Sequence, residues 1–138
     1  MKAAAEVKVL VVDDFQTMRE MMKACLRQLG YKDIQTAANG EEALDLITQN
    51  KFDLILCDWH MPGKKGIDVL KEVRKNQGAT VPFILATSES EQSCVVQAIE
   101  SGVSNYIIKP FNVDTLKKKI ESAVKKAEAA AAAPAPNA

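Results

Sequence analysis

The chain has 138 residues, of which 47% are hydrophobic and 26% charged, and its 18 basic residues balance its 18 acidic ones. This composition is typical of one globular domain of ordinary size, which needs no disulfide or metal to fold. It excludes the basic excess of a general nucleic-acid binder and the acidic excess of a disordered chain.

Cysteine and histidine usage narrows the class of protein further. The three cysteines are widely spaced, no CxxC motif occurs, and His60 is the only histidine, so zinc, iron–sulfur and disulfide frameworks are not expected. Free thiols are typical of a reducing compartment, and no apolar run approaches the roughly 20 residues of a membrane span. Because Glu6 and Lys8 interrupt any N-terminal signal pattern, we expect a cytoplasmic protein.

Short apolar runs alternate along the chain with segments of helical period. The runs predict five strands of the kind covered on both faces of a parallel sheet, at residues 7–12, 34–37, 52–57, 81–86 and 106–108. Each strand is followed by an apolar stripe at three- and four-residue spacing, which predicts a helix. The stripes begin with Met18, Met21 and Met22, with Ala43, with Ile67, with Val95 and with Leu116.

Five consecutive strand–helix units predict an α/β fold with one parallel sheet and helices on both faces. Five units are too few for a closed eight-stranded barrel, so we expect a single open, doubly wound domain over residues 1–127. Residues 128–138 are rich in alanine and proline and offer no large apolar side chain, so we expect a flexible C-terminal tail there, with some helix at its start because the alanines could extend the last helix.

Polar side chains stand at the carboxyl ends of four predicted strands. Asp13 and Asp14 end the first strand, Asp58 the third, Thr87 the fourth and Lys109 the fifth. In an open α/β sheet these ends meet at one edge, where ligands bind. Three carboxylates there repel one another, and Mg²⁺, which prefers oxygen ligands, is a natural partner for them. With a lysine and a hydroxyl beside them, the set is typical of phosphoryl transfer to a carboxylate nucleophile.

The same residues carry a family resemblance. Together with the segments Asp58-Trp59-His60-Met61-Pro62 and Lys109-Pro110-Phe111, they resemble the receiver domains of bacterial two-component response regulators, above all the single-domain chemotaxis regulators. The resemblance covers residues 6–127 and includes Gly66 and Tyr106 at matching positions. It implies a flavodoxin-like (βα)5 fold with strand order 2-1-3-4-5.

The resemblance implies a phosphorylation and metal site. Asp58 would accept a phosphoryl group from a sensor histidine kinase. One Mg²⁺ would be held by Asp58, by Asp14, by Asp13 directly or through water, and by the backbone carbonyl of His60. His60 stands where many such regulators have asparagine, and with Glu89 it would modulate the lifetime of the phosphate.

The resemblance also implies a switch and a readout surface. Thr87 and Lys109 would bind the phosphoryl oxygens, and the Lys109–Pro110 bond would be cis. Tyr106 would turn inward when Thr87 moves. The partner-binding surface would include Val95, Ile99, Tyr106, Ile108 and Lys119.

These expectations define a phosphorylation-activated signalling switch that is not an enzyme beyond its own phosphorylation and dephosphorylation at Asp58. Its favoured output partner is the flagellar motor switch protein of chemotaxis. A phosphatase is a further possible partner, the chain is expected to be a monomer, and neither nucleic acid nor membrane is expected to bind.

Other functions remain open as alternatives. The chain could be a single-domain phosphorelay intermediate or another stand-alone receiver. A Mg²⁺-dependent aspartyl-phosphate phosphohydrolase is more distant, because such enzymes place a second aspartate where His60 stands. A flavodoxin-like electron carrier is disfavoured, since Asp13 and Asp14 would repel a flavin phosphate.

Overall fold

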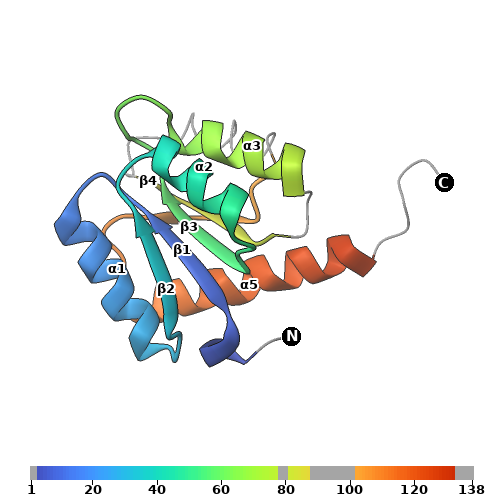
Figure 1. Cartoon of the computed structure of the whole chain (residues 1–138). Helices are drawn as coiled ribbons and strands as arrows, with labels where there is room; N and C mark the ends of the chain where they lie inside the picture. The colour runs from blue at the N-terminus through green and yellow to red at the C-terminus, as the bar shows by residue number, and fades with distance from the viewer. Residues whose placement is uncertain (1–2, 78–80, 88–101, 133–138) are drawn as a thin grey trace.

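The computed structural model describes residues 3–77, 81–87 and 102–132. Five parallel strands form one sheet in the order β2-β1-β3-β4-β5 (Figure 1). The strands are β1 (Lys8–Val12), β2 (Asp33–Ala37), β3 (Leu54–Asp58), β4 (Phe83–Thr87) and β5 (Asn105–Ile108). The predicted fold class and strand order are confirmed.

Helices cover both faces of the sheet. In the described residues they are α1 (Gln16–Gln28), α2 (Gly40–Gln49), α3 (Gly66–Gln77) and α5 (Val113–Ala132), and a short 3-10 turn, η1 (Ala4–Glu6), precedes β1. The predicted helix with Val95 lies outside the described residues. Within the described ranges, no helix combines the length and the apolar character that crossing a membrane requires.

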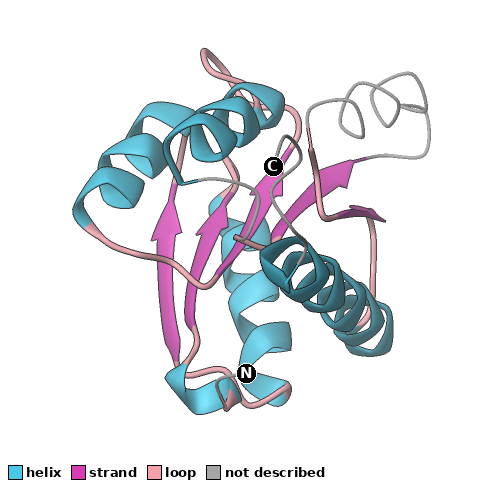
Figure 2. Cartoon of the chain, turned by 90° about the vertical axis from the view of Figure 1, so that its right-hand side faces the viewer, coloured by secondary structure: helices cyan, strands magenta, loops and turns pink. Residues whose placement is uncertain are grey.

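The sheet separates two hydrophobic cores. Alternate residues of a strand point to opposite faces, so Val9 and Val11 pack with α1 and α5 while Leu10 and Val12 pack with α2 and α3. Figure 2 shows the strands between these two pairs of helices. Because β3 and β4 are buried along their whole length, the centre of the sheet is a rigid support for the residues at its carboxyl edge.

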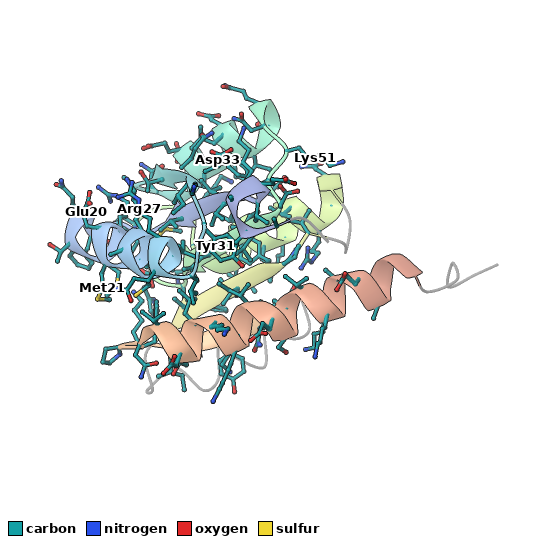
Figure 3. All side chains as sticks on the ribbon, turned by 90° about the horizontal axis from the view of Figure 1, so that it is seen from below. Glu20, Met21, Arg27, Tyr31, Asp33 and Lys51 are labelled. Atoms are coloured by element: carbon teal, nitrogen blue, oxygen red, sulfur yellow. The ribbon has the colours of Figure 1, made fainter. Side chains whose placement is uncertain are left out.

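The apolar stripe predicted on the first helix is only partly buried. Met22 is fully buried and Met18 is half-buried, but Met21 is 36% exposed. Figure 3 shows Met21 on the side of α1 that faces α5, with Arg27 on the opposite side. An apolar stripe at helical spacing covers only part of the helix circumference, and Met21 lies at its margin.

The last helix extends into the predicted tail. α5 continues through Ala132, so residues 128–132 are helical, as the alanine run allowed. Among the α5 residues whose burial is described, 113–129, Ala127 is the last buried one. Alanine has the highest helix propensity of all residues, so the alanine run extends the helix beyond it.

Candidate functional site at the carboxyl edge of the sheet

The strand register brings the predicted site residues together. Val12 of β1 is paired with Cys57 of β3, so the aspartates that follow these two residues are neighbours. Asp58 is paired with Ala86 of β4, and Thr87 comes next. The backbone N–H of Lys109 donates to the carbonyl of Thr87 at 2.7 Å, so Lys109, which follows β5, lies at the same edge of the sheet.

The three aspartates form one cluster. Asp13, Asp14 and Asp58 each offer a carboxylate oxygen, and these oxygens all lie within 4.8 Å of one another. Asp13 is fully buried and Asp58 is 4% exposed, while Asp14 is half-buried. Burial raises the pKa of Asp58, and the neighbouring charges of Asp13 and Asp14 raise it further, against the opposing effect of Lys109. The cluster is therefore a site of concentrated negative charge.

Lys109 supplies the positive charge. Its Nζ lies 2.7 Å from Oδ1 of Asp58 and 3.3 Å from Oδ2 of Asp13. Burial lowers the pKa of Lys109, but the ion pairs with Asp58 and Asp13 outweigh burial and leave that pKa raised. The other carboxylate oxygen of Asp13 accepts from the backbone N–H of Phe15 at 2.9 Å, so both oxygens of Asp13 have partners.

Two buried polar atoms beside the cluster lack any hydrogen-bond partner among the described residues: Oδ1 of Asp14 and Oγ1 of Thr87. Buried polar atoms are almost always paired in folded proteins, so each of these atoms is a candidate contact for a ligand. A hard cation would pair with the carboxylate of Asp14, and an anionic group would accept from the hydroxyl of Thr87. An all-carboxylate donor set fits Mg²⁺, which takes oxygen ligands.

The turn after β3 depends on Gly66. Its backbone N–H donates to the carbonyl of Trp59 at 2.9 Å. A Cβ added at Gly66 would lie 2.3 Å from the carbonyl oxygen of Asp58 and 2.8 Å from Cδ2 of Leu85. The start of α3 therefore rests directly on the backbone that carries Asp58, and only glycine fits there.

Replacing Gly66 by alanine is expected to lower the free energy of unfolding by about 2 kcal/mol, because overpacking outweighs the helix preference of alanine. Urea unfolding monitored by circular dichroism measures the change. Lys65→Ala, at the exposed neighbouring position, is the matched control and is expected to be near neutral. Equal stability of the two variants would contradict the close contact with Asp58.

Three further predictions concern His60, the Lys109–Pro110 bond and Tyr106. His60 is exposed immediately beyond β3 and Trp59. The Lys109–Pro110 bond is cis, as expected. Tyr106 is half-buried on β5, with Nζ of Lys119 from α5 at 4.8 Å from its ring centroid.

Ile108, at the end of β5, is 40% exposed. Glu89, Val95 and Ile99 lie outside the described residues, so their predicted roles stay predictions.

One contact at the site was not predicted. The guanidinium of Arg19 on α1 donates to the backbone carbonyl of Asp13 at 2.7 Å. This bond ties α1 to the end of β1 and so helps to fix the Asp13–Asp14 turn. No sequence pattern identifies a contact between an arginine and a backbone carbonyl, because every residue carries a carbonyl.

An open parallel sheet of this order, with three aspartates and a lysine at its carboxyl edge, has the arrangement expected of a receiver domain. Comparison with known proteins agrees: residues 9–121 match the response regulator receiver domain, and the chain belongs to that family. The central claim of the sequence analysis, that this is a receiver domain, is therefore confirmed.

Individual relatives are chemotaxis regulators. The chain is 40% identical to chemotaxis protein CheY-3 of Vibrio cholerae over 116 residues, which cover 83% of this chain and 89% of the relative. It is also 40% identical to chemotaxis protein CheY of Pseudomonas aeruginosa over 116 residues, 83% of this chain and 94% of the relative. Among solved structures, the chemotaxis response regulator CheY4 of Vibrio cholerae superposes with a TM-score of 0.77 at 33% identity, covering 85% and 98% of the two chains.

Proposed function

We propose that this receiver takes a phosphoryl group onto Asp58 from a histidine kinase, with Mg²⁺ held by Asp14, Asp58 and Asp13. Two observations carry the proposal. Oδ1 of Asp14 and Oγ1 of Thr87 are buried and have no hydrogen-bond partner among the described residues, and Oδ1 of Asp58 lies 2.7 Å from Nζ of Lys109 at the same edge of the sheet. Bound Mg²⁺ supplies positive charge that screens the carboxylates from an incoming phosphate.

The transfer is a balanced displacement at phosphorus. A carboxylate oxygen of Asp58 forms the new P–O bond while the P–N bond of the phosphohistidine donor breaks, and the imidazole nitrogen leaves with the electron pair. The protein mainly positions groups and offsets charge, since little other covalent chemistry is needed. Lys109 and the hydroxyl of Thr87 would meet the phosphoryl oxygens.

The acyl phosphate then acts as the signal. If Thr87 and Lys109 reach the phosphoryl oxygens in only one conformation of the chain, phosphorylation shifts the population toward that conformation. A shift from 1:99 to 99:1 needs about 5.5 kcal/mol of differential stabilisation. Hydrogen bonds to a charged group are individually worth about 1.5–3 kcal/mol, so two or three of them would be sufficient.

The proposed readout surface lies on β5 and α5, where Tyr106, Ile108 and Lys119 are half-buried or exposed. An exposed apolar side chain beside a lysine and an aromatic ring suits a partner segment that is both apolar and acidic. We propose the flagellar motor switch as that partner in a cytoplasmic chemotaxis pathway, because the named relatives are chemotaxis proteins. A phosphorelay intermediate is the second candidate.

The direct test is intact mass of the protein after incubation with acetyl phosphate. We expect the mass of one phosphoryl group to be added when Mg²⁺ is present and not when it is chelated. Trp59, 3% exposed and adjacent to Asp58, is expected to change its fluorescence over the same time course. A chain that gains no phosphoryl group under any Mg²⁺ concentration would refute the proposal.

A further inference from the structure

Arg74 lies in the last turn of α3, and its positive charge has no role in the proposed phosphorylation. Its guanidinium is half-buried and donates hydrogen bonds from all three nitrogens. Nε donates to the carbonyl of Gly102 at 2.7 Å, and the terminal nitrogens donate to the carbonyl of Val81 at 2.7 Å and to Oγ of Ser104 at 3.0 Å. The planar fork of arginine suits three acceptors in different directions, which a lysine ammonium matches less well.

The three acceptors lie at the amino ends of two neighbouring strands. Val81 comes two residues before β4, and Ser104 directly precedes β5. Ser104 is 5% exposed, and its Oγ also accepts from the backbone N–H of Phe83 at 3.0 Å. The backbone N–H of Ser104 donates to the carbonyl of Phe83 at 3.0 Å. Arg74 therefore joins the starts of β4 and β5 through one guanidinium.

The β5 strand needs such a constraint more than the central strands β1, β3 and β4 do. It lies at the edge of the sheet and has four residues, of which only Ile107 is fully buried. All five residues of β4 are buried, by contrast. The register of a strand is fixed by the burial of one face, so a short edge strand with one buried residue is weakly specified by packing alone.

The register of β5 controls the phosphorylation site. At the carboxyl end of the strand pair, the N–H of Lys109 donates to the carbonyl of Thr87 at 2.7 Å, and Nζ of Lys109 reaches Asp58 at 2.7 Å. A slip of one residue would move Lys109 by about 3.3 Å along the strand and turn its side chain to the other face. That displacement would break the ion pair with Asp58.

We propose that Arg74 is a positioning residue, which fixes the register of β5 against β4 and thereby holds Lys109 beside Asp58. Its contribution to the register is independent of phosphorylation. Its effect on the rate of phosphoryl transfer rests on the proposed function.

The first test is amide hydrogen exchange of Arg74→Met, which keeps the apolar stem and removes the donors. We expect protection of the Ser104 and Lys109 amides to fall about tenfold relative to the Asp53 amide, which donates to the carbonyl of Lys8 between β1 and β3. Arg74→Lys, with one ammonium in place of the fork, is expected to lose less protection. The matched control is Arg27→Met, an exposed arginine of α1 on the side away from α5 (Figure 3).

The outcomes separate a positioning role from a general structural one. A fall confined to the Ser104 and Lys109 amides supports the proposal. A parallel fall at Asp53 means that Arg74 only stabilises the fold, and an exchange pattern equal to that of Arg27→Met means that it does not act on β5. Either of these two results overturns the proposal.

The second test follows acetyl phosphate labelling of Asp58. In Arg74→Met we expect the rate of Asp58 labelling to fall about tenfold, because even a small displacement of Lys109 slows phosphoryl transfer. The affinity for Mg²⁺ is expected not to fall, because Asp13, Asp14 and Asp58 follow β1 or end β3. A rate equal to wild type despite altered exchange would refute the link to Lys109. If wild type itself is not labelled, the proposed function fails, and the exchange experiment still decides the role of Arg74.

Discussion

Asp58→Asn is expected to abolish labelling by acetyl phosphate and by any histidine kinase that serves this receiver. The amide nitrogen and oxygen of asparagine are poor nucleophiles, so no acyl phosphate forms. The 2.7 Å ion pair with Lys109 is also lost, although the neutral amide can still accept a hydrogen bond from the ammonium. The measurement is intact mass after incubation with phosphodonor and Mg²⁺, followed by peptide mapping of the wild-type adduct.

The control for this variant is Asp53→Asn. Asp53 lies at the amino end of β3, and its carboxylate accepts from the backbone N–H of Lys8. We expect Asp53→Asn to be labelled at the wild-type rate. Labelling of Asp58→Asn at another residue, with unchanged yield, would show that Asp58 is not the acceptor. Loss of labelling in both variants would show that the effect is one of folding.

Asp14→Asn is expected to remove the stabilisation that Mg²⁺ gives to the folded chain. A ligand at 100 times its dissociation constant stabilises a protein by about 2.7 kcal/mol. If the loss of one carboxylate ligand weakens binding about 100-fold, the same Mg²⁺ concentration gives only about 0.4 kcal/mol. Thermal unfolding with and without Mg²⁺ measures the difference, and without the metal the variant is relieved of repulsion from Asp13 and Asp58.

The matched control is Asp33→Asn at the exposed start of β2 (Figure 3). Because Asp33 lies at the amino end of its strand and the cluster lies at the carboxyl edge, its removal leaves the cluster intact. We expect Mg²⁺ to raise the unfolding temperature of this control as much as that of wild type. An equal response of Asp14→Asn to Mg²⁺ would place the metal elsewhere.

The two variants separate metal binding from chemistry. Asp14→Asn keeps the nucleophile and is expected to be labelled slowly at high Mg²⁺. Asp58→Asn is expected not to be labelled at any Mg²⁺ concentration. This difference follows from the proposed roles of the two residues. Oδ1 of Asp14 has no hydrogen-bond partner among the described residues, whereas Asp58 is paired with Lys109.

The sequence alone was sufficient to predict the sheet and the clustering of the three aspartates at its carboxyl edge. Strands such as β3 and β4 are continuous apolar runs, and the burial of the whole run is the physical reason that they are found in parallel sheets. Once the strands are parallel, Asp13, Asp58 and Thr87 must share one edge. How far α5 would continue into the alanine run could not be read from the sequence, because that run has helix propensity but no packing pattern.

Only the tertiary structure decided which partners the site residues have. How the strands and helices pack decides the pairing of Lys109 with Asp58 and the contact of Arg74 with Gly102. It also leaves Oδ1 of Asp14 and Oγ1 of Thr87 without a partner in the part of the chain that the structure describes. The types and spacing of residues reveal a periodicity only over a few neighbouring positions. They therefore identify helices and strands but not contacts between residues far apart in the chain. The bond from Arg74 spans 28 positions and ends on a backbone carbonyl, so no side-chain pattern in the chain could identify it.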